Sequence, residues 1–290
     1  MNNNMTSLIG AFVRYYHNKN SNIKIYDDKY AELILTKDEI FNISKSMSDG
    51  IKFFNPHYNG DNPLEWIVNN QLGPSVLARS AFNKQHLFNE IKLGLKQYVI
   101  IASGYDTSAY LVNDKVAVYE LDRPAIIEEK IKRVENASID NSNVVYIGCD
   151  FNNEWISLLL SSSYNPNSKT FCSLLGISYY LEKEVFNDTI NKLSSVMPSG
   201  SVILFDYPND MESKNEIINK ELAKASNEEM KSKYSYSDIE KIANDSNMLI
   251  YENLDNNDVD TNYFYKYNLL NPNNNIKAPS GVSYCLLVKN

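Results

Sequence analysis

The chain has 290 residues, of which 43% are hydrophobic and 22% charged, and its net charge is −8. This is the composition of an ordinary globular protein with a sizeable core. The sequence contains no apolar run long enough to span a bilayer and no basic segment followed by an apolar one at its start, so we expect neither a membrane partner nor a secretory signal. Because acidic residues outnumber lysine and arginine, nucleic acid is excluded as the main partner.

The cysteines and histidines do not form a recognisable metal or catalytic pattern. The cysteines have neither CxxC spacing nor a neighbouring histidine, which argues against a disulfide framework and against a metal site. Buried, reduced thiols in a cytoplasmic protein are the expected state. The histidines lack triad partners, so we expect structural or exposed roles for them. These residues are Cys149, Cys172 and Cys285, and His17, His57 and His86.

Residues 1–95 are predicted to form an N-terminal helical cap. Apolar residues recur at helical spacing over 27–47, and the segments 59–70 and 73–95 continue the pattern, each opening near a proline. We expect no strand before Gln97.

Residues 96–290 alternate between short apolar runs and helical segments. We predict strands at 97–102, 116–122, 143–149, within 169–181, at 200–207, 248–254 and 281–290, and helices at 124–137, 152–162, 182–196 and 236–247. This order predicts an α/β fold with a doubly wound, mostly parallel, seven-stranded Rossmann-like sheet. A strongly charged segment near 208–234 interrupts the alternation. It is interpreted as an inserted helix, either solvated on the surface or acting as a lid.

Ligands of such sheets bind at the carboxyl ends of the strands, so the residues there are the candidate site. The first strand runs into Ala102 and Gly104, where a dinucleotide fingerprint would need more glycines. The second strand ends in "YELD", so Glu120 or Asp122 could accept both hydroxyls of a ribose, or both could simply face solvent. After the third strand comes Asp150-Phe151, a carboxylate and a ring suited to an adenine. Together these strand ends predict an adenosine-type ligand.

Several segments in order resemble the leucine carboxyl methyltransferase-like family, which includes the tetracenomycin-biosynthesis type of O-methyltransferase. They include "LARSAFNKQHLFNEI", "QYVIIASGYDTSAYLV", "VYELDRPAIIEEKI", "CDFNNEWISLLL" and "GSVILFDY", and the resemblance extends over about residues 27–207. It implies a methyltransferase sheet that binds S-adenosylmethionine and releases S-adenosylhomocysteine.

The resemblance also assigns site residues. The family's Leu-Gly-Ala-Gly-Leu-Asp-Thr motif corresponds to Ile101 through Thr107, and an arginine that contacts the methionine carboxylate corresponds to Arg79. The expected cofactor-binding residues are Arg79, Ala102, Ser103, Gly104, Asp106, Glu120, Leu121, Asp122, Asp150, Phe151, Leu175 and Gly176.

Two positions depart from the family pattern. Ala102 replaces the first glycine of the motif, where a methyl group is tolerated if φ is negative. Leu175-Gly176 replaces a Glu-Gly pair, so backbone carbonyls would have to bind the methionine amine in place of the glutamate. Either change could impair turnover.

The resemblance implies an O-methyltransferase that acts on a carboxylate or acidic hydroxyl of a small molecule, less readily on a protein C-terminus. A carboxylate needs no general base, and the sequence offers no clear one. Tyr179, Tyr180 and Tyr207 follow the fourth and fifth strands and are candidates for the acceptor pocket, or for aromatic packing. The alternatives are a nicotinamide-dependent oxidoreductase and a non-catalytic adenosine-cofactor-binding protein. The sequence does not predict the oligomeric state.

Overall fold

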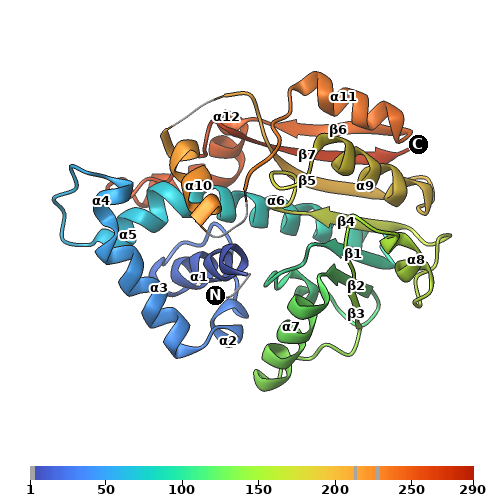
Figure 1. The fold of residues 1–290 in the computed structure, drawn as a ribbon, viewed down its shortest axis with the longest axis horizontal. Coiled ribbons are helices and arrows are strands. Elements are labelled where there is room, and N and C mark those ends of the chain that lie inside the picture. Colours follow the sequence, from blue (N-terminus) through green and yellow to red (C-terminus); the bar gives the residue numbers. More distant parts are fainter. Residues whose placement is uncertain (1–3, 212–213, 226–228) are drawn as a thin grey trace.

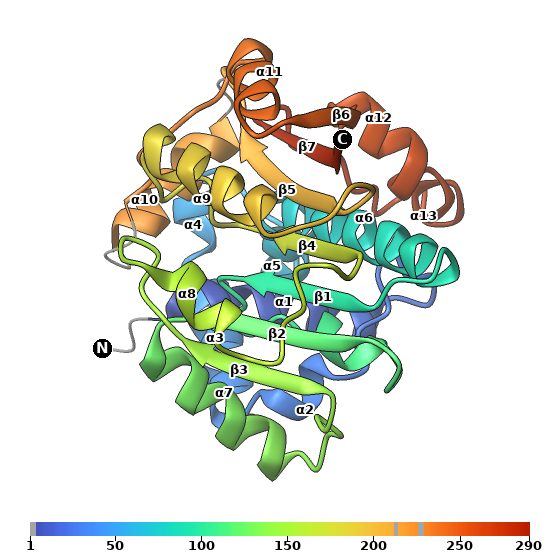
Figure 2. The same ribbon diagram turned by 90° about the vertical axis from the view of Figure 1, so that its right-hand side faces the viewer.

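The computed structural model describes residues 4–211, 214–225 and 229–290. Its centre is a seven-stranded sheet of order β3-β2-β1-β4-β5-β7-β6, with β3 and β6 at opposite edges (Figure 1, Figure 2). β7 is antiparallel to both of its neighbours, and the remaining pairs are parallel. The predicted doubly wound, mostly parallel sheet is therefore confirmed. The strands are β1 Gln97–Ile101, β2 Ala117–Asp122, β3 Val144–Gly148, β4 Thr170–Leu174, β5 Val202–Pro208, β6 Met248–Leu254 and β7 Val282–Lys289.

Helices cover both faces of the sheet, which explains why its central strands are apolar throughout. Successive side chains of β1 point to opposite faces, so Tyr98 and Ile100 join one core while Val99 and Ile101 join the other. The second core is closed by α8 Trp155–Leu160, α9 Lys183–Ser195 and α11 Tyr236–Asp245. The first core is closed by α7 Pro124–Asn136 and by the N-terminal helices.

The N-terminal region is helical, as predicted, and contains no strand between residues 4 and 96. The helix expected over 27–47 is divided, because Thr36 leaves the helical conformation and caps a new helix by accepting from the Glu39 amide. α6 packs against β4, β5 and β7, whereas α1 packs against α6 and α3. The elements are α1 Met5–Asn20, α2 Ala31–Ile34, α3 Lys37–Asp49, α4 Ile51–Phe54, α5 Pro63–Ile67, the π-helical η1 Val68–Leu72 and α6 Gly73–Lys92.

Two helical segments interrupt the second half of the fold. The charged insertion contains α10 Lys214–Ala225, and parts of the predicted segment, 212–213 and 226–228, lie outside the described residues. Between β6 and β7 the chain forms α12 Asn256–Val259, η3 Asp260–Phe264 and α13 Tyr265–Leu270, which the sequence did not lead us to expect. Their asparagine-rich surroundings resemble a loop, yet Val259, Phe264 and Tyr267 are buried in the core.

All three cysteines are buried, and none of them is disulfide-bonded. Among the described residues, no helix has the length and apolarity needed to cross a membrane.

Candidate functional site

The turn after β1 is the centre of the candidate site. Ala102 has a φ of +53° and Gly104 a φ of +43°, both in the left-handed region. A negative φ, the condition under which a methyl group at Ala102 would be tolerated without strain, is therefore not met, because the turn keeps the backbone conformation that a glycine would adopt. The Gly104 amide donates to Oδ2 of Asp122 at 2.8 Å, which ties this turn to the end of β2. Two further backbone bonds hold the turn, from Ser103 N to the Leu121 carbonyl and from Asp106 N to the Ser103 carbonyl.

Gly104 is also a point of close approach between the turn and α1. A Cβ at this position would lie 2.4 Å from Oγ and 3.0 Å from Cβ of Ser7, so a side chain here would require Ser7 to move. Ser7, Gly10 and Arg14 of α1 line a small cavity with Ala102, Gly104 and Asp106. Because Gly104 has no side chain, its backbone can line this cavity directly beneath α1.

The structure separates the two acidic candidates of β2. Glu120 is fully buried, and its carboxylate lies 2.6 Å from Nζ of Lys130 on α7, in an ion pair within the core. Asp122 lies one strand repeat further on, accepts from the amides of Gly104 and Arg123, and lines a cavity of about 370 Å³. Burial raises the pKa of Asp122, and these two amide hydrogen bonds oppose the shift. Of the two carboxylates, only Asp122 faces a space that could hold a ribose.

Asp150 and Phe151 line the same cavity as Asp122. Both Asp150 oxygens accept from asparagine side chains, Oδ1 from Asn152 and Oδ2 from Asn153, which fixes the carboxylate at the mouth. Phe151 packs edge-on against Trp155, with ring centroids 5.6 Å apart. The loop after β3 therefore offers an oriented carboxylate beside a supported ring.

Arg79 of α6 is the residue that connects the parts of the site. It lines the cavity beside the β1 turn, the cavity at Asp122, and a third one of about 130 Å³. Its guanidinium lies 3.6 Å from Oδ2 of the buried Asp206. Gly176, with a φ of +69°, leaves the space that Arg79 needs, since a Cβ there would lie 2.5 Å from its Nη1. Leu175 lines the first two of these cavities.

Asp206 is a site residue that the sequence did not single out. Its Oδ1 accepts from the Gly176 amide at 2.6 Å, and its Oδ2 accepts from the Tyr179 hydroxyl at 3.1 Å. The neighbouring candidate Tyr207 points to the opposite face of the sheet, because successive residues of a strand alternate. Tyr207 packs against Phe205 and Tyr234 in the other core and donates to Asn253. The signal available in the sequence was the "FDY" strand end, of which the aspartate rather than the tyrosine faces Arg79.

Tyr179 and Tyr180 do line the 130 Å³ cavity, together with Arg79 and Gly176. Tyr179 is buried, and burial, followed by the charge of Asp206, raises the pKa of its hydroxyl well above the usual value. A neutral hydroxyl that already donates to a carboxylate is a poor general base.

The sequence-based prediction also assigned no residue of helix α1 to the site, although this helix lies against the β1 turn. Arg14 donates to Oδ2 of Asp28 at 2.8 Å and to the Tyr105 carbonyl at 2.6 Å, and Thr107 donates to the same aspartate oxygen. These buried bonds fix α1 directly over the β1 turn. An arginine among the apolar residues of "IGAFVRYY" was the available signal.

The arrangement fits an adenosine cofactor with a charged amino-acid tail. The glycine turn provides a close backbone approach, Asp122 a ribose acceptor, Asp150-Phe151 an adenine edge, and Arg79 a cation for a carboxylate. The turn lacks the glycines that a pyrophosphate requires.

Comparison with known proteins identifies the family and the fold of the chain. A family model described as leucine carboxyl methyltransferase matches residues 7–194. A putative S-adenosyl-L-methionine-dependent methyltransferase of Bacillus subtilis, YktD, is 33% identical over 98% of this chain and 97% of its own length. Among solved structures, a duf574 family protein from Streptomyces avermitilis superposes with a TM-score of 0.62 at 14% identity, covering 98% of this chain and 97% of that one. Magnesium protoporphyrin IX methyltransferase from Synechocystis, solved with bound S-adenosylhomocysteine, superposes with a TM-score of 0.50 at 10% identity, covering 86% of this chain and 99% of that one.

Proposed function

The chain belongs to the leucine carboxyl methyltransferase family and is an S-adenosylmethionine-dependent methyltransferase, and from this premise we propose that it methylates an oxygen of a small-molecule carboxylate or acidic hydroxyl. Family membership decides against the nicotinamide-dependent alternative, as does the glycine-poor turn after β1. The observation that carries the proposal is the position of Arg79, which lines the cofactor cavities and the adjoining 130 Å³ cavity at once.

The chain's own residues would hold the cofactor along the strand ends. In the proposal, Asp122 accepts the ribose hydroxyls, Asp150 and Phe151 bind the adenine edge and face, and Arg79 pairs with the methionine carboxylate. Ala102, Ser103, Gly104 and Asp106 form the wall beside the methionine part. When bound, S-adenosylmethionine supplies an electrophilic methyl group on its sulfonium.

Among the described residues, the lining of the 130 Å³ cavity, called the acceptor cavity below, contains no histidine, aspartate or glutamate, which supports an acceptor that is already ionised. Tyr179 is neutral and committed to Asp206, and no histidine lines the acceptor cavity among the residues that the structure describes. A carboxylate is ionised at neutral pH and needs only to be positioned. The protein's task is then to orient that oxygen and to exclude water.

The test is to incubate the protein with S-adenosylmethionine, radiolabelled in its methyl group, and a panel of carboxylic acids, phenols and alcohols. Methyl esters release labelled methanol on treatment with base, whereas methyl ethers do not. We expect base-labile label with carboxylic acids. Binding of S-adenosylhomocysteine without transfer to any oxygen acceptor would contradict the proposal and favour a non-catalytic binding protein.

A further inference from the structure

An apolar chamber adjoins the acceptor cavity and has no role in the cofactor site. Its volume is about 530 Å³, and its wall comes from α1, α3, α4, η1 and α10. Apolar side chains make up most of that wall, among them Leu8, Ile43, Met47, Phe53 and Phe54. Cavities of this size and character are typical of sites for small apolar ligands.

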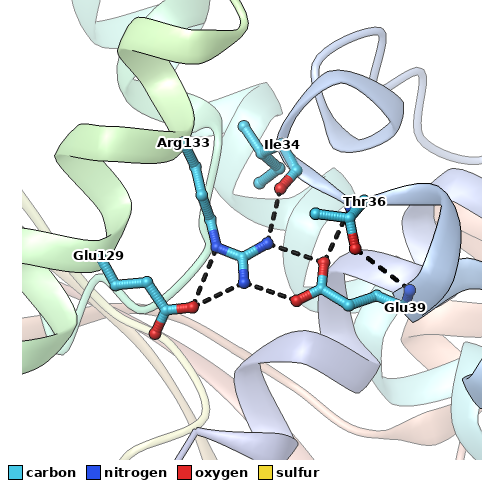
Figure 3. Close-up of polar contacts among 5 residues, drawn as sticks. All are labelled: Ile34, Thr36, Glu39, Glu129 and Arg133. Carbon is cyan, nitrogen blue, oxygen red and sulfur yellow. Dashed lines mark hydrogen bonds and ion pairs between the residues drawn. The ribbon is translucent and has the colours of Figure 1, made fainter.

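Among the described residues, Glu39 is the one charged residue of the chamber wall, and it is paired with Arg133, which lies outside the chamber. Both Glu39 oxygens accept from Arg133 of α7, at 2.6 and 2.8 Å, and one of them also accepts from the Thr36 amide (Figure 3). Arg133 further donates to Glu129 and to the Ile34 carbonyl, so its guanidinium is held on every side. The chamber therefore offers an incoming ligand apolar contact rather than a free charge.

The chamber and the acceptor cavity are neighbours that share part of their walls. Ile9, Leu72 and Leu222 line both spaces. Arg79, Gly176 and Tyr179 line the smaller cavity but not the chamber, and the methyl group would be transferred beside them. A ligand that fills both spaces must therefore have a small polar end and a larger apolar end.

The relative sizes of the acceptor cavity and the chamber indicate the shape of a ligand that fills both. The passage beside Arg79 measures about 130 Å³ and the chamber about 530 Å³. The narrow space suits a single aliphatic chain better than a fused ring system attached directly to the reacting group, and the wide space leaves room for such a chain to fold. Flexible walls such as Met5 and Met47 suit a chain without fixed shape.

We propose that the acceptor is an aliphatic carboxylic acid, with its carboxylate beside Arg79 and its chain in the chamber. The inference rests on the proposed O-methyl transfer and names its substrate class. A carboxylate oxygen of the acid forms the new O–CH₃ bond while the sulfonium C–S bond breaks and its electron pair stays on sulfur. The products are a neutral methyl ester and S-adenosylhomocysteine, and no proton is transferred.

The experiment compares butanoic, octanoic, dodecanoic and hexadecanoic acids, below their micellar concentrations, by base-labile methyl transfer. Each methylene that enters the chamber contributes ~0.8 kcal/mol, so kcat/KM should rise by roughly fourfold per methylene until the chamber is full. Equal kcat/KM for butanoic and hexadecanoic acids, or a preference for a fused-ring aromatic acid, overturns this inference and leaves the proposed function standing. Methyl ethers from phenols or alcohols without esters from any acid overturn this inference alone. No transfer to any acid, phenol or alcohol, with S-adenosylhomocysteine still bound, overturns both.

A pair of variants tests whether the aliphatic chain of the acid lies in the chamber. Ser46 is exposed, lies on α3 and lines the chamber, so Ser46→Trp should fill part of it. Ser48→Trp, on the same helix but outside the chamber wall, is the matched control. Excluding two methylenes costs roughly 15-fold in kcat/KM. We expect Ser46→Trp to lower kcat/KM by about that factor for hexadecanoic acid only, with unchanged values for butanoic acid and for S-adenosylhomocysteine affinity. Equal losses for both acids, or losses of the same size in Ser48→Trp, overturn the assignment.

Discussion

The two sides of the site are built by different means. On the cofactor side, hydrogen bonds between strand ends fix the backbone, as in the bonds from Gly104 to Asp122 and from Gly176 to Asp206. On the chamber side, helices from three parts of the sequence present apolar side chains to one another: α1, the α3–η1 region and α10. The position of α3 depends on packing and on its ion pair with Arg133. Helix α1 belongs to both, with Ser7 and Arg14 on the cofactor side and Leu8 on the chamber side.

This difference indicates which side of the site tolerates amino-acid substitutions more easily. A hydrogen-bonded strand end tolerates few residue types, since each bond requires its particular donor or acceptor. An apolar wall tolerates many residue types of similar volume. Under the proposed assignment, the cofactor side would specify the methyl donor, while the chamber side could adapt to a new acceptor. Four measurements would break or sharpen this comparison.

The largest effect should come from Arg79→Ala on the cofactor side. Loss of a charge-assisted contact should weaken S-adenosylhomocysteine binding by about 1.5–3 kcal/mol, measured by isothermal titration calorimetry. Gln85→Ala, at an exposed position of the same helix, serves as the control. Unchanged affinity in Arg79→Ala would remove this arginine from the cofactor contact and leave it as a partner of Asp206 alone.

The second prediction concerns α1, the helix shared by the two sides, and its pH dependence. The Ile25 amide donates to Nε2 of His17 at 2.9 Å, so this ring must stay neutral. Burial, followed by the charge of Lys24, lowers the pKa of His17 to about 4. A histidine in the unfolded chain titrates near ~6.5, so the unfolded state binds more protons between these values. The free energy of unfolding should therefore fall as the pH falls from about 6.5 to 4, by on the order of 2 kcal/mol.

Urea denaturation at several pH values measures this slope, and His17→Asn should reduce it. The slope should not vanish, because burial also lowers the pKa of His86, to about 4. His57→Asn, at an exposed position of a loop, is the control for the effect of replacing a histidine. If His17→Asn retained the full slope, protonation of His17 would have no part in the acid sensitivity of α1.

The third prediction tests whether the chamber side is held by Arg133. Its side chain is 13% exposed and that of Glu39 is 18% exposed, so their pair is less screened than a surface pair. Arg133→Ala should lower the free energy of unfolding by about 1–2 kcal/mol, because Glu39 loses its partner. It should also lower kcat/KM for long-chain acids more than affinity for S-adenosylhomocysteine.

The matched control for Arg133→Ala lies on α3 itself. Lys45 and Asp49 form a pair at 2.7 Å, but both side chains are more than 60% exposed, so Lys45→Ala should leave the midpoint of urea denaturation almost unchanged. Equal effects of the two variants would mean that packing alone positions the chamber wall.

The same division explains what could be predicted from the sequence. The strands and the turn after β1 are local patterns, so the fold class and the strand-end positions followed directly. Glu120 and Asp122 could not be distinguished, because the residue that decides between them, Lys130, lies on the next helix. The chamber could not be predicted at all. Its wall brings Leu8, Ile43, Phe54 and Leu222 together from helices whose relative positions only the tertiary structure defines.

The smallest predicted effect concerns Ala102, where the cofactor side itself departs from its family's pattern. A left-handed conformation costs a non-glycine residue about 1–2 kcal/mol, and a glycine costs roughly 0.5–1 kcal/mol more than alanine in unfolded-chain entropy. Ala102→Gly should therefore stabilise the protein by about 0.5 kcal/mol in urea denaturation. Ser138→Gly, at a φ of +51° outside the site, should give a similar gain and serves as the control.

If only Ala102→Gly also raised S-adenosylhomocysteine affinity, the alanine methyl would be an obstacle in the cofactor cavity. If the wild type and Ala102→Gly bound S-adenosylhomocysteine equally well, the methyl group of Ala102 would not obstruct the cofactor cavity. A residue other than glycine would then be compatible with this turn as long as its backbone stays left-handed.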